Sequence, residues 1–151
     1  MAEAAEDDWI ETPAAEGSCQ CGAVRYRIAA GPTRASVCHC RMCQRQVGGP
    51  YAAFLKLPAD RVTWLAEPAW FASSDIAERG FCPACGTPLA FRSFGEDQIE
   101  VTEGSLPAGF PFRPVRQFGM ESRLGWIDHL AGLPGEATTE QAHSHQAAEG
   151  R

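Results

Sequence analysis

The amino-acid sequence predicts a mainly β protein, with all or nearly all of its regular structure in strands. Three observations support this prediction. Short runs of apolar and β-branched residues recur along the chain, 15 glycines and 11 prolines interrupt them, and no segment carries a long apolar stripe with the period of a helix. The length of 151 residues suits one domain with its own hydrophobic core.

Seven segments have the composition of short strands. The first alternates apolar and polar residues with a period of two, which is typical of a strand with one buried face. Turn residues, including Pro58 and Pro68, separate later segments. In chain order, the predicted strands are residues 23–28, 51–57, 61–65, 70–72, 89–92, 98–101 and 115–120. Six aromatic residues are predicted to lie in the core: Trp64, Trp70, Phe71, Phe81, Phe91 and Trp126.

The composition changes at both ends of this region. Residues 1–16 are rich in alanine and acidic side chains, and residues 135–151 carry no apolar periodicity. We expect both segments to be flexible tails around one domain at residues 17–134. His143 and His145 lie in the second tail, where solvation is a better expectation for them than metal binding.

The charge and hydropathy patterns exclude several classes of partner. A net charge of −6 and a calculated pI of 5.2 disfavour non-specific nucleic-acid binding, which needs a basic surface. No apolar run reaches the length of about 18 residues that a membrane span needs. The acidic N-terminal residues do not resemble a secretory leader, so we expect a cytoplasmic protein. Disulfides are rare in that compartment and seven cysteines cannot all pair within one chain, which favours metal ligation or thiol chemistry.

The cysteines form three groups, and the third group is the simplest to interpret. Cys82 and Cys85 stand in a Cys-Pro-Ala-Cys-Gly turn, which directs two sulfurs toward one point, and Gly86 adopts conformations that other residues resist. A redox dithiol is the alternative, but such sites need a helix after the motif, and Pro88 disfavours one. Metal binding is therefore the preferred role.

A closed zinc site needs four ligands, and Cys19 and Cys21 are the natural second pair. On a flat strand their side chains would be about 6.5–7 Å apart. Sulfurs that share a tetrahedral zinc lie only about 3.8 Å apart. The backbone is therefore expected to bend at this pair, which the flanking Gly17 and Gly22 facilitate.

This pairing leaves Cys38, Cys40 and Cys43. Three protein ligands with a free fourth position are typical of a reactive zinc rather than a structural one. His39 is an alternative fourth ligand that would close the site, although alternation along an extended chain points it away from its two neighbours.

The net charge of an open three-thiolate zinc site indicates that it needs positively charged residues nearby. Three thiolates and one divalent zinc leave one net negative charge, and an incoming thiolate would add a second. Nearby cations should therefore support binding, and Arg41, Arg45 and Arg79 are the candidates by position. For Arg41 and Arg45, a solvated surface position is an equally good interpretation.

The cysteine groups and their flanking residues resemble the family of glutathione-dependent formaldehyde-activating enzymes, which includes centromere protein V. The resemblance extends over residues 17–134. The matching segments are residues 17–26 (GSCQCGAVRY), 38–43 (CHCRMC), 79–89 (RGFCPACGTPL) and 121–123 (ESR), with Trp126 and residues 133–134. Three features depart from the family pattern. Arg41 stands where members often carry serine, Gln44 stands where they often carry arginine, and residues 115–120 contain no histidine where many members have one.

The resemblance implies a β-tent fold of twisted antiparallel sheets with zinc-binding knuckles. It also implies two zinc ions per chain and the same division of the cysteines. The implied ligands are Cys19, Cys21, Cys82 and Cys85 for a structural zinc, and Cys38, Cys40 and Cys43 for a catalytic zinc. The implied activity is the condensation of glutathione with formaldehyde to S-hydroxymethylglutathione, a carbon–sulfur lyase reaction in the reverse direction.

Two functions are expected from these features. The first is an enzyme whose partners are a small-molecule thiol, most readily glutathione, and a small aldehyde. Arg41, Arg45 and Arg79 are the candidate partners of the glutathione carboxylates. Glu121 is a candidate general acid by position, although a surface carboxylate is its commoner role. The alternative is a non-catalytic, zinc-stabilised module that binds another protein.

Overall fold

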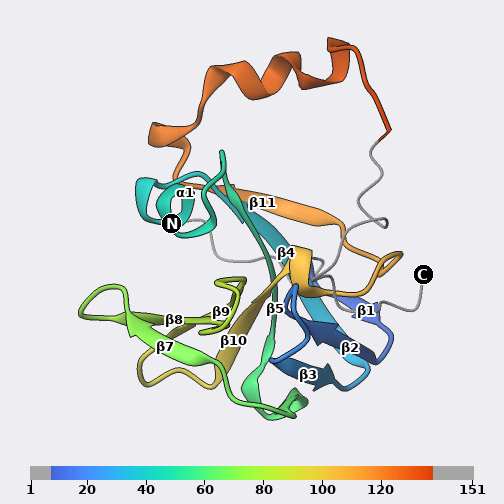
Figure 1. Cartoon of the computed structure of the whole chain (residues 1–151), viewed down its shortest axis with the longest axis vertical. Helices are drawn as coiled ribbons and strands as arrows, with labels where there is room; N and C mark the ends of the chain where they lie inside the picture. The colour runs from blue at the N-terminus through green and yellow to red at the C-terminus, as the bar shows by residue number, and fades with distance from the viewer. Residues whose placement is uncertain (1–7, 138–151) are drawn as a thin grey trace.

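The computed structural model describes residues 8–137 and confirms a mainly antiparallel β architecture (Figure 1). Its strands are β1 (Ile10–Thr12), β2 (Ala15–Ser18), β3 (Arg25–Ile28), β4 (Gly31–Cys38), β5 (Ala52–Pro58), β6 (Val62–Trp64), β7 (Ala69–Ala72), β8 (Ala77–Phe81), β9 (Pro88–Ser93), β10 (Gln98–Thr102) and β11 (Pro114–Phe118). The larger sheet has the order β1-β4-β5-β10-β9-β8-β7, and β11 pairs in parallel with β4. The smaller sheet has the order β2-β3-β6.

Short helices connect the strands. The α-helix is α1 (Arg41–Val47), and the 3-10 helices are η2 (Ala59–Arg61), η3 (Glu103–Ser105), η4 (Met120–Ser122) and η5 (Gly125–Gly132). No helix within residues 8–137 is long and apolar enough to cross a membrane.

Each of the seven predicted strand segments contains a strand, and the observed bounds differ from the predicted ones by no more than two residues. Strands β1, β2, β4 and β8 were not predicted, and neither was α1. Strand β1 lies inside the segment that we expected to be a flexible tail, and β2 begins inside it. Residues 10–12 pair with β4 in the register Ile10↔Thr33, and residues 15–18 pair with β3. The ordered fold therefore begins earlier than residue 17, and all of residues 138–151, with His143 and His145, lie outside the described residues.

The main core lies between the two sheets. Tyr26 and Ile28 of the smaller sheet pack with Leu55, Leu57 and Val101 of the larger sheet, and all five are almost completely buried. The strict alternation of burial along β3, exposed at Arg25 and Arg27 and buried between them, is the pattern of a strand with one solvated face. This packing fixes the relative position of the two sheets.

A second, smaller cluster forms on the opposite face of the larger sheet. Cys43, Ala52 and Phe54 are buried there, and Phe91 and Val47 pack against them. Helix α1 supplies Cys43 and Val47 to this cluster. Its N-cap is Cys40, whose sulfur accepts a hydrogen bond from the Cys43 backbone N–H, and its C-cap is Gly48 in a left-handed conformation. The cluster holds α1 against the end of the sheet.

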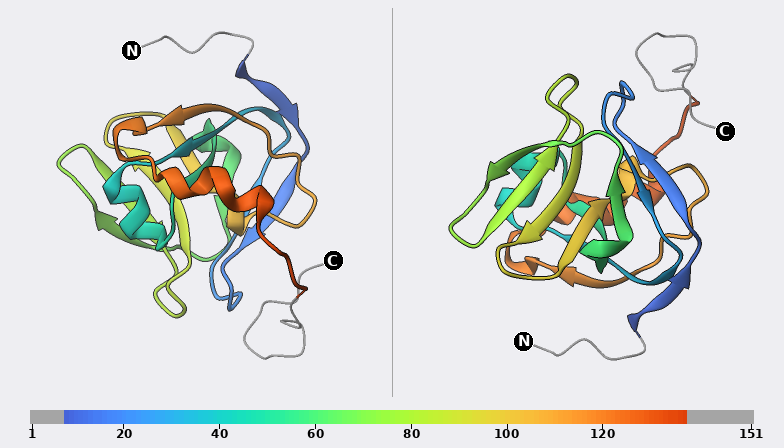
Figure 2. Two further views of the ribbon diagram at one scale, coloured as in Figure 1. Left: turned by 90° about the horizontal axis from the view of Figure 1, so that it is seen from above. Right: turned by 90° about the horizontal axis from the view of Figure 1, so that it is seen from below.

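After β11, the chain crosses the same end of the molecule as α1 (Figures 1 and 2). Helix η5 lies there as the orange segment, and none of its residues is buried. Trp126 is 50% exposed and Phe71 on β7 is 62% exposed, so the prediction that both lie in the core was wrong. Trp64 and Trp70 do pack against the main core, and Phe91 packs against the smaller cluster.

Candidate metal centres and the adjoining cavity

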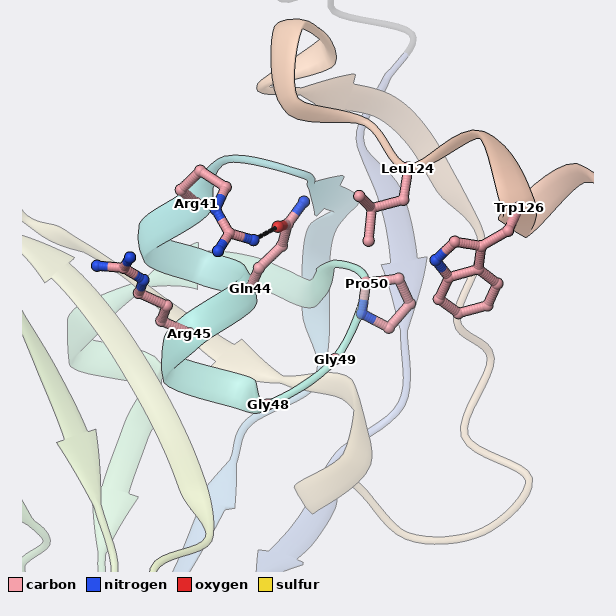
Figure 3. Close-up of a pocket in the computed structure, with 8 residues that line it drawn as sticks. All are labelled: Arg41, Gln44, Arg45, Gly48, Gly49, Pro50, Leu124 and Trp126. Carbon is pink, nitrogen blue, oxygen red and sulfur yellow. Dashed lines mark hydrogen bonds between the residues drawn. The ribbon is translucent and has the colours of Figure 1, made fainter.

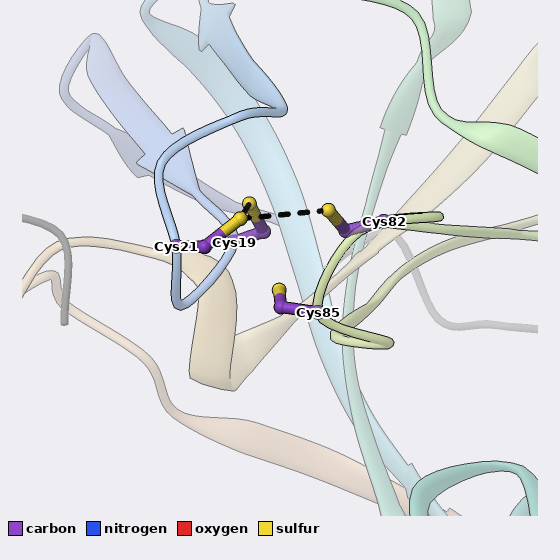
Figure 4. A group of neighbouring side chains, drawn as sticks. All are labelled: Cys19, Cys21, Cys82 and Cys85. Carbon is purple, nitrogen blue, oxygen red and sulfur yellow. Dashed lines mark hydrogen bonds between the residues drawn. The ribbon is translucent and has the colours of Figure 1, made fainter. Parts of the chain in front are cut away.

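The first cysteine cluster joins two loops that are distant in sequence. Cys19 and Cys21 come from the turn between β2 and β3, and Cys82 and Cys85 come from the turn between β8 and β9 (Figure 4). The sulfur atoms lie 3.6 Å apart for Cys19 and Cys21, and 3.8 Å apart for Cys21 and Cys82. All four sulfurs lie within 4.8 Å of one another. The structure thus brings together the four cysteines that spacing had paired.

Backbone hydrogen bonds shape both turns. In the first, the Cys19 N–H donates to the Val24 carbonyl at 3.0 Å, and the Val24 N–H donates to the Cys19 sulfur at 3.3 Å. In the second, the Gly86 N–H donates to the Cys82 carbonyl at 2.8 Å, with Gly86 at a φ of 80° that favours glycine. The predicted bend at Cys19 and Cys21 is therefore present. A strand, β9, follows the second turn in place of the helix that a redox motif needs.

The donor set of this cluster fits zinc. The sulfur separations of 3.6 and 3.8 Å are close to the edge of a zinc–thiolate tetrahedron, about 3.8 Å. All four cysteines are free thiols, and the two pairs are held together by a hydrogen bond from the Gln20 N–H to the Thr87 hydroxyl at 3.0 Å. Cys19 and Cys82 are buried, as in a closed structural site.

The second cluster contains three sulfurs, from Cys38, Cys40 and Cys43, again within 4.8 Å of one another. Cys38 ends β4, Cys40 caps α1, and Cys43 lies in the first turn of α1. No other histidine, cysteine, aspartate or glutamate within residues 8–137 contributes a ligand atom to this cluster. Its donor set fits a zinc site with three protein ligands and a fourth position for another molecule.

His39 is oriented away from the three sulfurs. Its backbone N–H donates to the Phe118 carbonyl at 2.8 Å, and its Nε2 atom lies 3.0 Å from Oε1 of Gln117 on β11. The ring is buried and makes an edge contact with Tyr51 at a centroid distance of 5.5 Å. His39 therefore joins β4 to β11, and the alternative in which it closes the three-thiol site is not supported.

Gly119 provides the close packing that completes the site. It has a φ of 66°, and a Cβ atom placed on it would lie 2.4 Å from the Cys40 nitrogen and 2.9 Å from the Cys40 Cα. Only glycine fits there without moving the Cys40 backbone. The turn after β11 thus packs directly against the residue that caps α1.

The three candidate arginines occupy different environments. Arg79 is buried on β8, and its Nη2 atom donates to the Cys43 sulfur at 3.4 Å. A hydrogen bond from Cys38 and the charge of Arg79 outweigh burial and lower the pKa of Cys43 to about 5. The same thiol pair raises the pKa of Cys38. The hydrogen bond from Arg79 therefore favours the thiolate form of Cys43.

Arg41 and Arg45 line a cavity of about 370 Å³ between α1 and the C-terminal segment (Figure 3). Gln44, Gly48, Gly49, Pro50, Leu124 and Trp126 complete its walls. The Arg41 guanidinium donates to the Gln44 side-chain oxygen, and the Gln44 amide in turn donates to the His39 and Ser122 carbonyls at 2.7 and 2.9 Å. Arg79 does not reach this cavity.

The sequence did not predict the cavity wall supplied by Trp126, because Trp126 was expected to lie in the core with the other aromatic residues. The only signal in the sequence was its place in the matching C-terminal motif. Glu121, the positional candidate for a general acid, lies exposed on η4 and does not line the cavity.

Comparison with known proteins places this fold and these cysteines in context. A Schizosaccharomyces pombe protein named "uncharacterized lyase" is 35% identical over 79 residues, which cover 52% of this chain and only 58% of that protein. A Halomonas elongata protein named "putative glutathione-dependent formaldehyde-activating enzyme" is 29% identical over 144 residues, covering 83% of this chain and 92% of its own length.

A solved structure supports the fold independently. The crystal structure of a Rhodobacter sphaeroides protein matches with a TM-score of 0.51 at 19% identity, over 68% of this chain and 98% of that one. The family model of the glutathione-dependent formaldehyde-activating enzymes matches residues 14–121, which include all seven cysteines. The chain therefore belongs to the family of glutathione-dependent formaldehyde-activating enzymes.

Proposed function

We propose that this protein is a zinc-dependent, lyase-type enzyme that joins the thiol of glutathione to formaldehyde, or to a related small aldehyde, as an S-hydroxymethyl adduct. The observation that carries the proposal is the three-thiol cluster, because the described residues offer it no fourth protein ligand. Its helix also lines a cavity with two arginines. The names of the two relatives, a lyase and a formaldehyde-activating enzyme, support the same reaction class.

Two zinc ions are part of this proposal. The closed cluster would hold one as a structural ion through Cys19, Cys21, Cys82 and Cys85. Cys38, Cys40 and Cys43 would hold the other. A zinc ion at this second cluster supplies Lewis acidity that favours the thiolate form of a coordinating thiol.

The residues of the chain have separate roles in the proposed reaction. A carbon–sulfur bond forms between the thiol sulfur and the aldehyde carbon, the thiol proton leaves to solvent, and the former carbonyl oxygen takes up one proton. Arg41 and Arg45 would hold the charged ends of the tripeptide thiol, because they line the cavity beside α1, the helix that carries Cys43 and is capped by Cys40. The exposed indole of Trp126 forms the opposite wall and restricts solvent around the bound peptide.

The direct test is to titrate glutathione into the zinc-loaded protein by calorimetry, and then to add 13C-formaldehyde and follow the adduct by NMR. We expect saturable heat and faster formation of S-hydroxymethylglutathione than in protein-free buffer. A serine variant of Cys40 is the matched control, since it removes one ligand of the open cluster alone. No heat at millimolar glutathione would contradict the proposal.

A further inference from the structure

Arg79 is a buried cation with almost no polar partners. Its side chain is 4% exposed, and its guanidinium lies over the ring of Phe91 at 5.0 Å from the centroid. One nitrogen, Nη2, donates to the Cys43 sulfur at 3.4 Å. The other two, Nε and Nη1, are buried and have no hydrogen-bond partner among the described residues. Such a group is strongly unfavourable unless a negative charge lies nearby.

No carboxylate within residues 8–137 forms an ion pair with Arg79. Arg79 on β8 lies opposite Phe91 on β9, and Phe91 lies opposite Glu100 on β10. Glu100 is therefore the acidic residue aligned with Arg79 across the sheet. The backbone of Glu100 therefore lies two strand spacings, roughly 9.6 Å, from that of Arg79. Its carboxylate interacts electrostatically with Arg79, but its ion pair is with Lys56 at 3.9 Å. The sulfur of Cys43 is thus the anionic group that Arg79 contacts.

We propose that Arg79 is the permanent counter-ion of the three-thiol cluster, and that its charge makes the fourth position selective for an anionic ligand, a thiolate, over a neutral one. This inference rests on the proposed function. It selects between the two roles expected for Arg79 from the sequence: support of the negative charge at the open site, which it favours, and binding of a substrate carboxylate. Arg79 is a positioning residue, because it acts through Cys43 and does not touch the substrate.

Charge balance gives the reason for the selectivity. Three thiolates, one zinc ion and Arg79 sum to zero, so an incoming thiolate leaves a single negative charge. Without Arg79 the same complex carries two negative charges in a partly buried site, where repulsion is only weakly screened. A neutral ligand adds no charge, so its binding depends much less on Arg79. Arg41 cannot replace Arg79 in this role, because it is exposed and bonded to Gln44.

The test uses two small ligands without carboxylates, 2-mercaptoethanol as the thiol and imidazole as the neutral ligand. Each is titrated by calorimetry at one pH into the zinc-loaded wild type and into Arg79→Met, Arg79→Lys and Arg92→Met. For Arg79→Met we expect the affinity for 2-mercaptoethanol to fall about tenfold or more and the affinity for imidazole to change by less than about twofold. Arg79→Lys, which keeps the charge, should bind the thiol within about threefold of the wild type.

Arg92→Met is the matched control. Arg92 lies on the neighbouring strand β9 with its guanidinium over Trp70 and is paired with Glu78, on the opposite face of the sheet from Arg79. We expect its variant to bind both ligands as the wild type does. Should Arg79→Met fail to fold, Arg79→Gln keeps hydrogen-bond donors without the charge and carries the same expectation.

The outcomes separate this inference from the proposed function. If the wild type binds no thiol at all, the proposed function fails, and the inference is decided by the zinc affinity of the three-thiol cluster in competition with a chelator. Removing the counter-ion should then weaken zinc binding about tenfold in Arg79→Met, but not in Arg79→Lys. Equal loss of thiol and imidazole binding in Arg79→Met, or no loss of thiol or zinc binding, would overturn the inference.

Discussion

Arg41 and Gln44, which both depart from the family pattern, hydrogen-bond to each other on α1. Gln44 also donates to carbonyls on both sides of the helix, at His39 and Ser122, and it is buried while Arg41 is exposed. The two departures are therefore linked. The buried Gln44 amide connects the helix to the C-terminal segment, and the Gln44 oxygen orients the Arg41 guanidinium beside the cavity.

This arrangement gives a prediction for substrate recognition. We expect the double variant Arg41→Gln/Arg45→Gln to weaken glutathione binding about fivefold, because each exposed arginine contributes modestly to holding a carboxylate. Binding of 2-mercaptoethanol, which has no carboxylate, should be unchanged. Calorimetry on zinc-loaded protein measures both.

Arg113→Gln is the control for that experiment, since Arg113 is exposed and does not line the cavity. Equal weakening of both thiols in the double variant would show that the arginines support the fold of the site rather than the peptide part of the ligand.

Spacing alone predicted which cysteines cluster, because ligands within a group are close in sequence and ligand counting then limits the pairing. It could not predict the contact from Arg79 to Cys43, which joins residues 36 positions apart. That contact depends on the register between β8 and β9 and on the packing of α1 against the sheet. The local sequence pattern predicts neither of these.

At the level of elements, the three-thiol cluster depends on the crossing of β11, β4 and α1. Strand β11 runs parallel to β4 with Phe118 opposite Cys38, and its following turn places Gly119 against Cys40. The geometry of the cluster is therefore set by a segment that contributes no ligand to it.

Gly119→Ala should disrupt this crossing selectively. The new Cβ atom would overlap the Cys40 backbone, and the left-handed conformation would add strain, at a combined cost of about 2 kcal/mol or more. We expect the variant to lose about one zinc per chain, from the three-thiol cluster, and to stay folded. Metal analysis with thermal unfolding measures the outcome.

Gly125→Ala is its matched control, because a Cβ atom there meets nothing within 4 Å. Full zinc content in Gly119→Ala would show that the turn after β11 adapts, and that the crossing does not define the cluster.

The elements that sequence reasoning missed share a physical cause. Strand β4 begins at Gly31 and Pro32, which are typical of a turn, yet it is held by pairing with three other strands. Helix α1 has seven residues, too few to show a helical apolar stripe, and is stabilised by its Cys40 cap and its buried face. Tertiary contacts determine both elements, whereas the seven predicted strands carry their own local pattern.

For the whole molecule, the two cysteine clusters lie with different hydrophobic cores, on opposite faces of the larger sheet. The closed cluster joins loops at the main core, where Cys19 and Cys82 are buried with Leu89. The open cluster lies on the smaller core of the opposite face. Loss of metal from the closed cluster should therefore lower the stability of the fold more than loss of metal from the open cluster.

Serine variants of Cys82 and Cys40 test that division and the alternative function. We expect Cys82→Ser to lower stability by about 3 kcal/mol or more, because metal binding contributes directly to folding at such sites. Cys40→Ser should unfold at close to the wild-type temperature but bind no thiol. Thermal unfolding and calorimetry provide the two readouts, and a comparable stability loss in both variants would favour a zinc-stabilised binding module.

Strand β8 links the two clusters along the chain. Its Arg79 faces Cys43, and three positions later Cys82 belongs to the closed cluster. A one-residue insertion or deletion between them would put the two positions out of phase, so that the strand could keep either Arg79 beside Cys43 or Cys82 beside its partners, but not both. Sequence drift can therefore change the residue types in this interval, but a change in its length costs one of the two contacts.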